Sequence, residues 1–181
     1  MYRRIKMNTS LLWMRIPAMA QEITNYLKRE CSVNGLTNAF FNGLICWLLI
    51  KNHGTITWWG QHNFGYDIIA TGFILPFIVT LIVIPIQRSK MAKSKTPKFH
   101  LDRSISSHAF LNRFPKSLTG RAFYFGLIGM AVIGGLSLLL LALIGVQEFT
   151  PLQYSIFKGV WAGVLASILV VPMILLALDQ N

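Results

Sequence analysis

Hydrophobic residues are concentrated in four runs along the chain, and charged residues lie between these runs. The runs cover residues 31–50, 68–86, 122–146 and 159–178. Each is close to the roughly 20 residues that a helix needs to cross about 30 Å of hydrocarbon. Lipid offers no hydrogen-bond partners to the backbone, so membrane runs of this kind predict helices. The pattern predicts an all-α membrane protein with four transmembrane helices.

Lysine and arginine are distributed unevenly over the segments that connect these runs. Of 17 basic residues, six lie in residues 1–33 and nine in residues 88–121, whereas residues 51–66 hold one and residues 147–153 hold none. By the positive-inside rule, both termini and the long basic loop lie in the cytoplasm, and we expect a multi-pass protein of the bacterial cytoplasmic (inner) membrane. Four aromatic residues then fall at the outer interface: Trp58, Trp59, Phe64 and Tyr66.

The net charge of +11 also raises the question of a nucleic-acid partner. The basic residues alternate between loops, whereas a nucleic-acid footprint needs a folded basic face. We therefore expect no nucleic acid, and anionic lipid as the partner of the basic loop.

The apolar runs divide the chain into four parts. Residues 1–30 form a cytoplasmic N-terminal segment, 31–86 a first two-helix hairpin, 87–121 the basic loop and 122–181 a second hairpin. Within the first part, the apolar stretch 11–16 is too short and interrupted to be a signal peptide. It predicts a short interfacial segment on the inner leaflet.

The two hairpins resemble each other in sequence. Residues 39–45 align with 122–128, and residues 80–85 align with 167–172. Two helices in each unit give both copies the same orientation, so the alignment predicts a parallel repeat about an axis along the membrane normal.

Small residues recur four apart in the first and fourth runs. They are Gly35, Ala39 and Gly43 in the first run, and Gly159 and Gly163 in the fourth. Small residues at this spacing let helix backbones approach closely in lipid, so these positions are candidate packing seams.

The first run also carries a stripe of amides, Asn34, Asn38 and Asn42, at the same spacing. Two interpretations stay open: hydrogen bonds between helices or subunits, or the polar lining of a binding or permeation path. Asp67 and Lys158 begin the second and fourth spans at the same interface. They are either separate interfacial charges or an ion pair between the two hairpins.

Prolines mark the two even-numbered spans, and they too allow two interpretations. Pro85 and Pro172 lie near the cytoplasmic ends, and Pro76 lies within the second span. A proline inside a helix removes one backbone hydrogen bond, so Pro76 predicts either a kink or an unwound site.

Some of these motifs are similar to those of known membrane proteins. Residues 155–178, which close on Val170-Val171-Pro172, resemble the second helix of small two-span bacterial proteins grouped as a domain of unknown function. Residues 38–88, with Thr71-Gly72-Phe73 and Ile84-Pro85-Ile86, resemble four-span bacterial membrane proteins. The resemblance implies a fold built from two-helix hairpins and implies no activity.

No pattern of catalytic, cofactor-binding or metal-binding residues stands out. The chain holds six acidic residues, its four histidines lack the spacing of metal ligands, and it has no phosphate-binding loop. We therefore expect a non-enzymatic protein without a cofactor or metal, which self-associates or serves as an accessory subunit of a membrane complex. The alternative is a small transporter or channel subunit that acts as an oligomer.

Overall fold

The computed structural model describes residues 9–93, 95–96 and 114–178. The elements are α1 (Thr9–Ile50), β1 (Ile56–Thr57), α2 (Phe64–Ala92), α4 (Leu118–Ile128), the π-helical segment η2 (Gly129–Gly134), α5 (Gly135–Leu143), β2 (Glu148–Phe149) and α6 (Pro151–Leu178). The predicted all-α class and the four spans are confirmed. Four helical stretches are long and apolar enough to cross a membrane: Gln21–Ile50, Phe64–Ala92, Leu118–Leu143 and Pro151–Ala177. Residues 97–113, most of the predicted basic loop, lie outside the described residues.

The N-terminal part differs from the expected interfacial segment. Helix α1 begins at Thr9 and continues through the first span to Ile50 without a break. The sequence between Pro17 and Cys31 contains neither glycine nor a second proline, so nothing there ends the helix. The predicted first run, residues 31–50, forms the C-terminal part of this helix.

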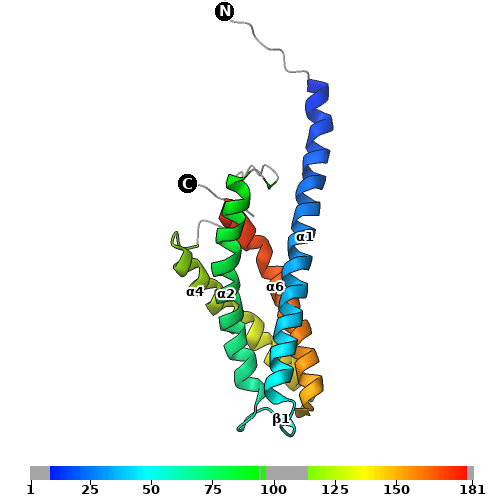
Figure 1. The fold of residues 1–181 in the computed structure, drawn as a ribbon, viewed down its shortest axis with the longest axis vertical. Coiled ribbons are helices and arrows are strands. Elements are labelled where there is room, and N and C mark those ends of the chain that lie inside the picture. The colour runs from blue at the N-terminus through cyan, green and yellow to red at the C-terminus, as the bar shows by residue number, and fades with distance from the viewer. Residues whose placement is uncertain (1–8, 94, 97–113, 179–181) are drawn as a thin grey trace, which may run out of the picture.

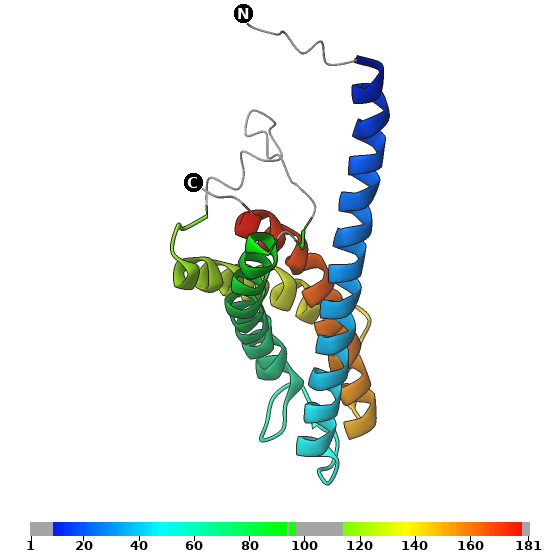
Figure 2. The same cartoon turned by 45° about the horizontal axis from the view of Figure 1, so that its top comes forward.

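The four spans form an open array rather than two separately packed hairpins. Helix α1 packs along α6, while α2 packs on both α6 and α4. Helices α1 and α2 are consecutive in the chain but do not pack along each other. The array therefore runs α1, α6, α2, α4, and α1 and α4 lie at its edges (Figures 1 and 2). We call the end with β1 and β2 the strand end and the end with Lys90 and Arg121 the basic end.

The strand end is closed by a small sheet and a cluster of aromatic rings. β1 pairs with β2 in antiparallel fashion, and Trp58 Nε1 donates to the carbonyl of Val146 at 2.6 Å. Phe64 is fully buried among Trp58, Phe149 and Tyr154. Its ring fills the space between the two short connections. Trp59 and Tyr66 remain exposed.

Side chains also define where the helices begin. Asn63 Oδ1 accepts from the amide of Tyr66 at the start of α2. At the start of α6, the amide of Thr150 donates to Gln153 Oε1 at 2.9 Å, and Pro151 needs no amide partner. At the basic end, Arg121 Nη1 donates to the carbonyl of Leu176 in the last turn of α6, where a positive charge complements the helix dipole.

The contact between α1 and α6 depends on the small residues of both helices. A Cβ atom on Gly159 would lie 2.8 Å from the carbonyl oxygen of Ala39 and 3.2 Å from Cα of Gly43. A Cβ atom on Gly163 would lie 2.9 Å from the carbonyl oxygen of Gly35. The two backbones therefore approach each other more closely than side chains would allow. We call this contact the α1–α6 seam.

Helix α2 remains helical through Pro76. The ring of Pro76 leaves the carbonyl of Gly72 without its usual donor, and Gly129 of η2 packs against this carbonyl. A Cβ atom at Gly129 would overlap both the Gly72 carbonyl and the Pro76 ring, so only glycine fits here. The unwound alternative for Pro76 is thus wrong.

We expect Gly159→Ala to destabilise the protein by about 1–3 kcal/mol, because the added methyl group meets rigid backbone at the seam. The matched control is Gly135→Ala, whose added Cβ would meet nothing within 4 Å. This control should be neutral or stabilising by up to about 1 kcal/mol, because alanine favours helix. Thermal unfolding of both variants in one detergent measures the difference. Equal melting temperatures would contradict the close contact.

Candidate functional site

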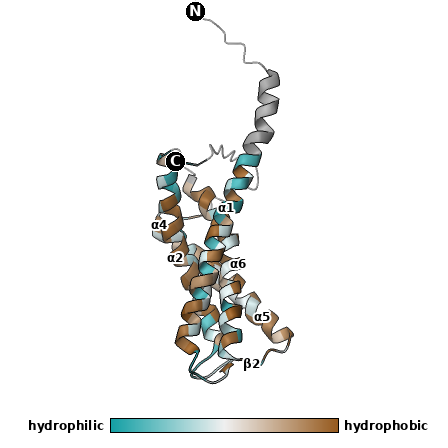
Figure 3. Ribbon diagram, turned by 45° about the vertical axis from the view of Figure 1, so that its right-hand side comes forward, coloured by the Kyte–Doolittle hydropathy of each residue, from teal (hydrophilic) through white to brown (hydrophobic). Residues whose placement is uncertain are grey.

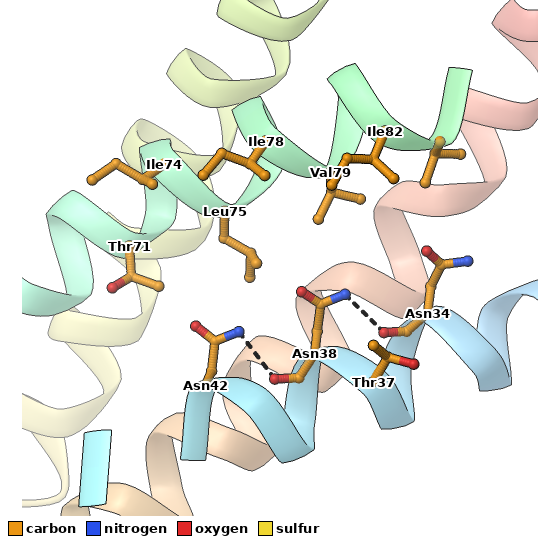
Figure 4. A pocket seen from close by; sticks show the side chains of 11 residues that line it. Asn34, Thr37, Asn38, Asn42, Thr71, Ile74, Leu75, Ile78, Val79 and Ile82 are labelled. Carbon is orange, nitrogen blue, oxygen red and sulfur yellow. Dashed lines mark hydrogen bonds between the residues drawn. The ribbon is translucent and has the colours of Figure 1, made fainter. Parts of the chain in front are cut away.

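A cavity of about 390 Å³ lies between α1 and α2. Four polar residues of α1 and seven residues of α2 line it: Asn34, Thr37, Asn38 and Asn42, and Thr71, Ile74, Leu75, Ile78, Val79, Ile82 and Val83 (Figure 4). We call it the amide groove. One wall is polar and the other is apolar, although both belong to membrane-crossing helices.

The polar wall follows from the spacing of the asparagines. Residues four apart lie on one face of a helix, about 6 Å from each other along its axis. The three amides are half-buried and lie on the side of α1 that faces α2. Figure 3 shows that hydrophilic positions recur along α1, whereas α5 is mainly hydrophobic.

Each asparagine bonds to its own helix. The Nδ2 atoms of Asn34, Asn38 and Asn42 donate to the carbonyls of Glu30, Asn34 and Asn38 at 2.8, 2.8 and 3.0 Å. No hydrogen bond joins these three amides to another helix among the described residues, so the expected interhelical bonds are not found within the chain. A backbone carbonyl only accepts, so one of the two N–H groups of each amide is used within the helix. The amide oxygen and the second N–H of each side chain have no hydrogen-bond partner among the described residues.

An ion pair lies toward the strand end, where Asp67 is one turn of α2 before Thr71 of the groove. Lys158 Nζ of α6 lies 2.7 Å from both carboxylate oxygens of Asp67, and the hydroxyl of Tyr154 donates to the same carboxylate. Asp67 and Lys158 thus join α2 to α6 in the structure. The pair lines a second cavity of about 350 Å³, together with Cys46 and His62.

At the basic end, a second polar cluster joins α1 to α2. The buried carboxylate of Glu30 accepts from Gln87 Nε2 at 2.6 Å and from Lys90 Nζ at 2.8 Å. Gln87 in turn accepts from the hydroxyl of Tyr26, over whose ring Arg29 lies. Sequence reasoning missed this cluster. The available signal was the position of Glu30, one helical repeat before Asn34.

The predicted small residues of α1 face α6, whereas its asparagines face the groove. Gly35, Ala39 and Gly43 lie in the seam against Gly159 and Gly163, and none of them lines the amide groove. They hold α1 in the orientation that turns its amides toward α2.

The described residues contain no group of three or more histidine, cysteine or acidic side chains that could hold a metal ion. Cys31 and Cys46 are free thiols. The groove itself is lined by no charged side chain. Its arrangement allows hydrogen bonding and apolar contact rather than acid–base or nucleophilic chemistry.

The chain matches no protein-family model, and no similar curated protein or solved structure was found. The resemblance to hairpin-built bacterial membrane proteins therefore stays a hypothesis drawn from the sequence.

We expect Asp67 and Lys158 to be energetically coupled, because each is only partly exposed and neutralising one leaves the other charge without its partner. Asp67→Asn and Lys158→Met should each cost about 1–2 kcal/mol, a value between exposed and buried pairs. The double variant should lose less than the sum of the two. Thermal unfolding of this cycle measures the coupling, with Lys51→Met as an exposed control. Strictly additive losses would contradict it.

Proposed function

We propose that the protein is a small, non-enzymatic transporter or channel subunit that binds its substrate in the amide groove. The observation that carries this proposal is the use of Asn34, Asn38 and Asn42. Within the described part of the chain, their amides bond to no other helix, and they line a cavity. Polar side chains within membrane spans are costly, and those that face a cavity are typical of substrate paths.

The two ends of the groove also favour a path across the membrane. The row of amides leads from the Glu30 cluster at the basic end toward the Asp67–Lys158 pair at the strand end. A substrate would therefore meet hydrogen-bonding groups over most of the span rather than at one point.

A second candidate is self-association, or a role as an accessory subunit of a membrane complex. The edge position of α1 favours it. In the most apolar 18-residue stretch of α1, only 11% of the residues are buried inside the protein, compared with 56% in the corresponding stretch of α6. A neighbouring membrane protein would cover this helix and supply partners to the amides.

The orientation and the membrane belong to the proposal as well. The abundance of lysine and arginine at the basic end supports cytoplasmic termini in a bacterial inner membrane. It also supports anionic lipid as the partner of residues 87–121.

We include the internal duplication in the proposal, because two contacts support it. Gly72 and Gly159 occupy equivalent positions in the predicted repeat. Each receives a glycine from a neighbouring span: Gly129 approaches Gly72, and Gly43 approaches Gly159. In the alignment Gly43 corresponds to Gly126, three residues before Gly129, so the two contacts correspond to within one helical turn. Two parallel hairpins related by an axis along the membrane normal would give contacts of this kind.

Native mass spectrometry of the purified protein tests the function. We expect the wild type to retain a bound small molecule or lipid, and Asn38→Leu to lower its occupancy about threefold to tenfold, as loss of one hydrogen bond predicts. The oligomeric mass and the melting temperature should not change. Asn52→Leu, the same substitution in an exposed loop, is the matched control and should retain the ligand.

The same experiment separates the second candidate. If Asn38→Leu dissociates an oligomer while any bound molecule remains, the amides serve association between proteins. That result, or a wild type that carries nothing, would contradict the transporter proposal.

A further inference from the structure

We infer that the amide groove selects amphiphiles whose polar group donates hydrogen bonds, such as a primary ammonium or a hydroxyl group on a hydrocarbon chain. This inference rests on the proposed function and names the chemical class of its substrate. It follows from four properties of the groove.

The first property is its size. A cavity of about 390 Å³ falls within the range of small-molecule sites, which begins near 300 Å³. A transmembrane helix is about 10 Å wide with its side chains and exceeds this space. The groove therefore suits one small molecule or one hydrocarbon chain.

The second property is the apolar wall. Six of the seven α2 residues that line the groove are leucine, isoleucine or valine, and Thr71 is the exception. Ile74, Ile78 and Ile82 are about half exposed, so hydrocarbon can reach this wall from the side of the groove. A substrate gains affinity here by covering these side chains with an apolar body.

The third property is the fixed orientation of the amides. One N–H of each Nδ2 atom donates to a backbone carbonyl, whereas the oxygens of Asn34, Asn38 and Asn42 accept no hydrogen bond among the described residues. Thr37 and Thr71 can donate or accept. Each amide keeps one further N–H, but each amide oxygen has two lone pairs. Acceptor positions, about 6 Å apart along α1, therefore outnumber these N–H donors, and a ligand that donates satisfies more of them.

The fourth property is the charge of the surroundings. No cationic side chain lines the groove, so nothing there would replace the water around an anion. The two nearby lysines, Lys90 and Lys158, are already engaged with the carboxylates of Glu30 and Asp67. Acidic head groups are therefore disfavoured.

Four probes with the same twelve-carbon chain separate these properties. Dodecylamine and dodecanol carry donors, dodecyltrimethylammonium carries a charge without an N–H donor, and dodecyl sulfate is an anionic acceptor. Equilibrium binding is measured to the full chain in lipid nanodiscs, with empty nanodiscs of the same lipid subtracted. The amine and the alcohol should bind at least about tenfold more tightly than the other two.

Variants locate the binding in the groove. Asn38→Leu and Asn42→Leu should each weaken the binding of the amine and the alcohol about threefold to tenfold, and Asn52→Leu should leave it unchanged. Each variant must first show the same melting temperature as the wild type, so that a loss of binding does not reflect a loss of folding.

The outcomes separate this inference from the proposed function. If dodecyltrimethylammonium or dodecyl sulfate binds as well as the amine, and Asn38→Leu weakens that binding, the groove binds substrates but the donor rule is wrong. If no probe exceeds the empty nanodisc, or if binding is unaffected by Asn38→Leu and Asn42→Leu, both the inference and the proposed function are contradicted.

Discussion

The close backbone contact between α1 and α6 is the interaction on which the rest of the structure depends. Among the described residues, α6 is the helix that packs along α1. The seam of Gly35, Ala39 and Gly43, together with the Glu30 cluster, therefore determines which way the other faces of α1 point. Lipid supplies no hydrophobic drive between helices, and close approach of small residues replaces it. Each asparagine precedes a small residue by one position, so packing the seam on α6 turns the amides toward α2.

The amide groove is a consequence of this arrangement. Helices α1 and α2 meet through side chains at the Glu30 cluster and diverge between the two ends of the bundle. Among the described residues, these amide oxygens have no protein partner, and a polar group without a partner in a membrane span is unfavourable for folding. Structures that retain such groups in membrane spans generally use them to bind something.

The class of fold could be predicted from the sequence, because an apolar run in lipid must pair all of its backbone amides internally. A helix does this, so four apolar runs predict four helices. The sequence was not sufficient to predict the partner of α1. Consecutive helices usually pack together, and only the fold reveals that Gly43 meets Gly159 instead of a residue of α2. The Glu30 cluster was not predicted because its residues lie just outside the predicted spans. Glu30 precedes the first span, predicted to begin at residue 31, and Gln87 and Lys90 follow the second, predicted to end at residue 86. The asparagine bonds were missed because a side chain can bond its own helix as readily as a neighbour.

Disulfide trapping tests most directly the claim that α1 is held by α6 and stands apart from α2. In a variant without Cys31 and Cys46, one cysteine pair replaces Gly35 and Ser167, where the Cβ positions are 3.5 Å apart and suit a disulfide. The other pair replaces Asn38 and Val79 on opposite walls of the groove. Mild oxidation in membranes should cross-link the first pair and leave the second reduced. Cross-linking of Asn38→Cys to Val79→Cys, with none between positions 35 and 167, would show that α1 packs on α2 and would contradict the account.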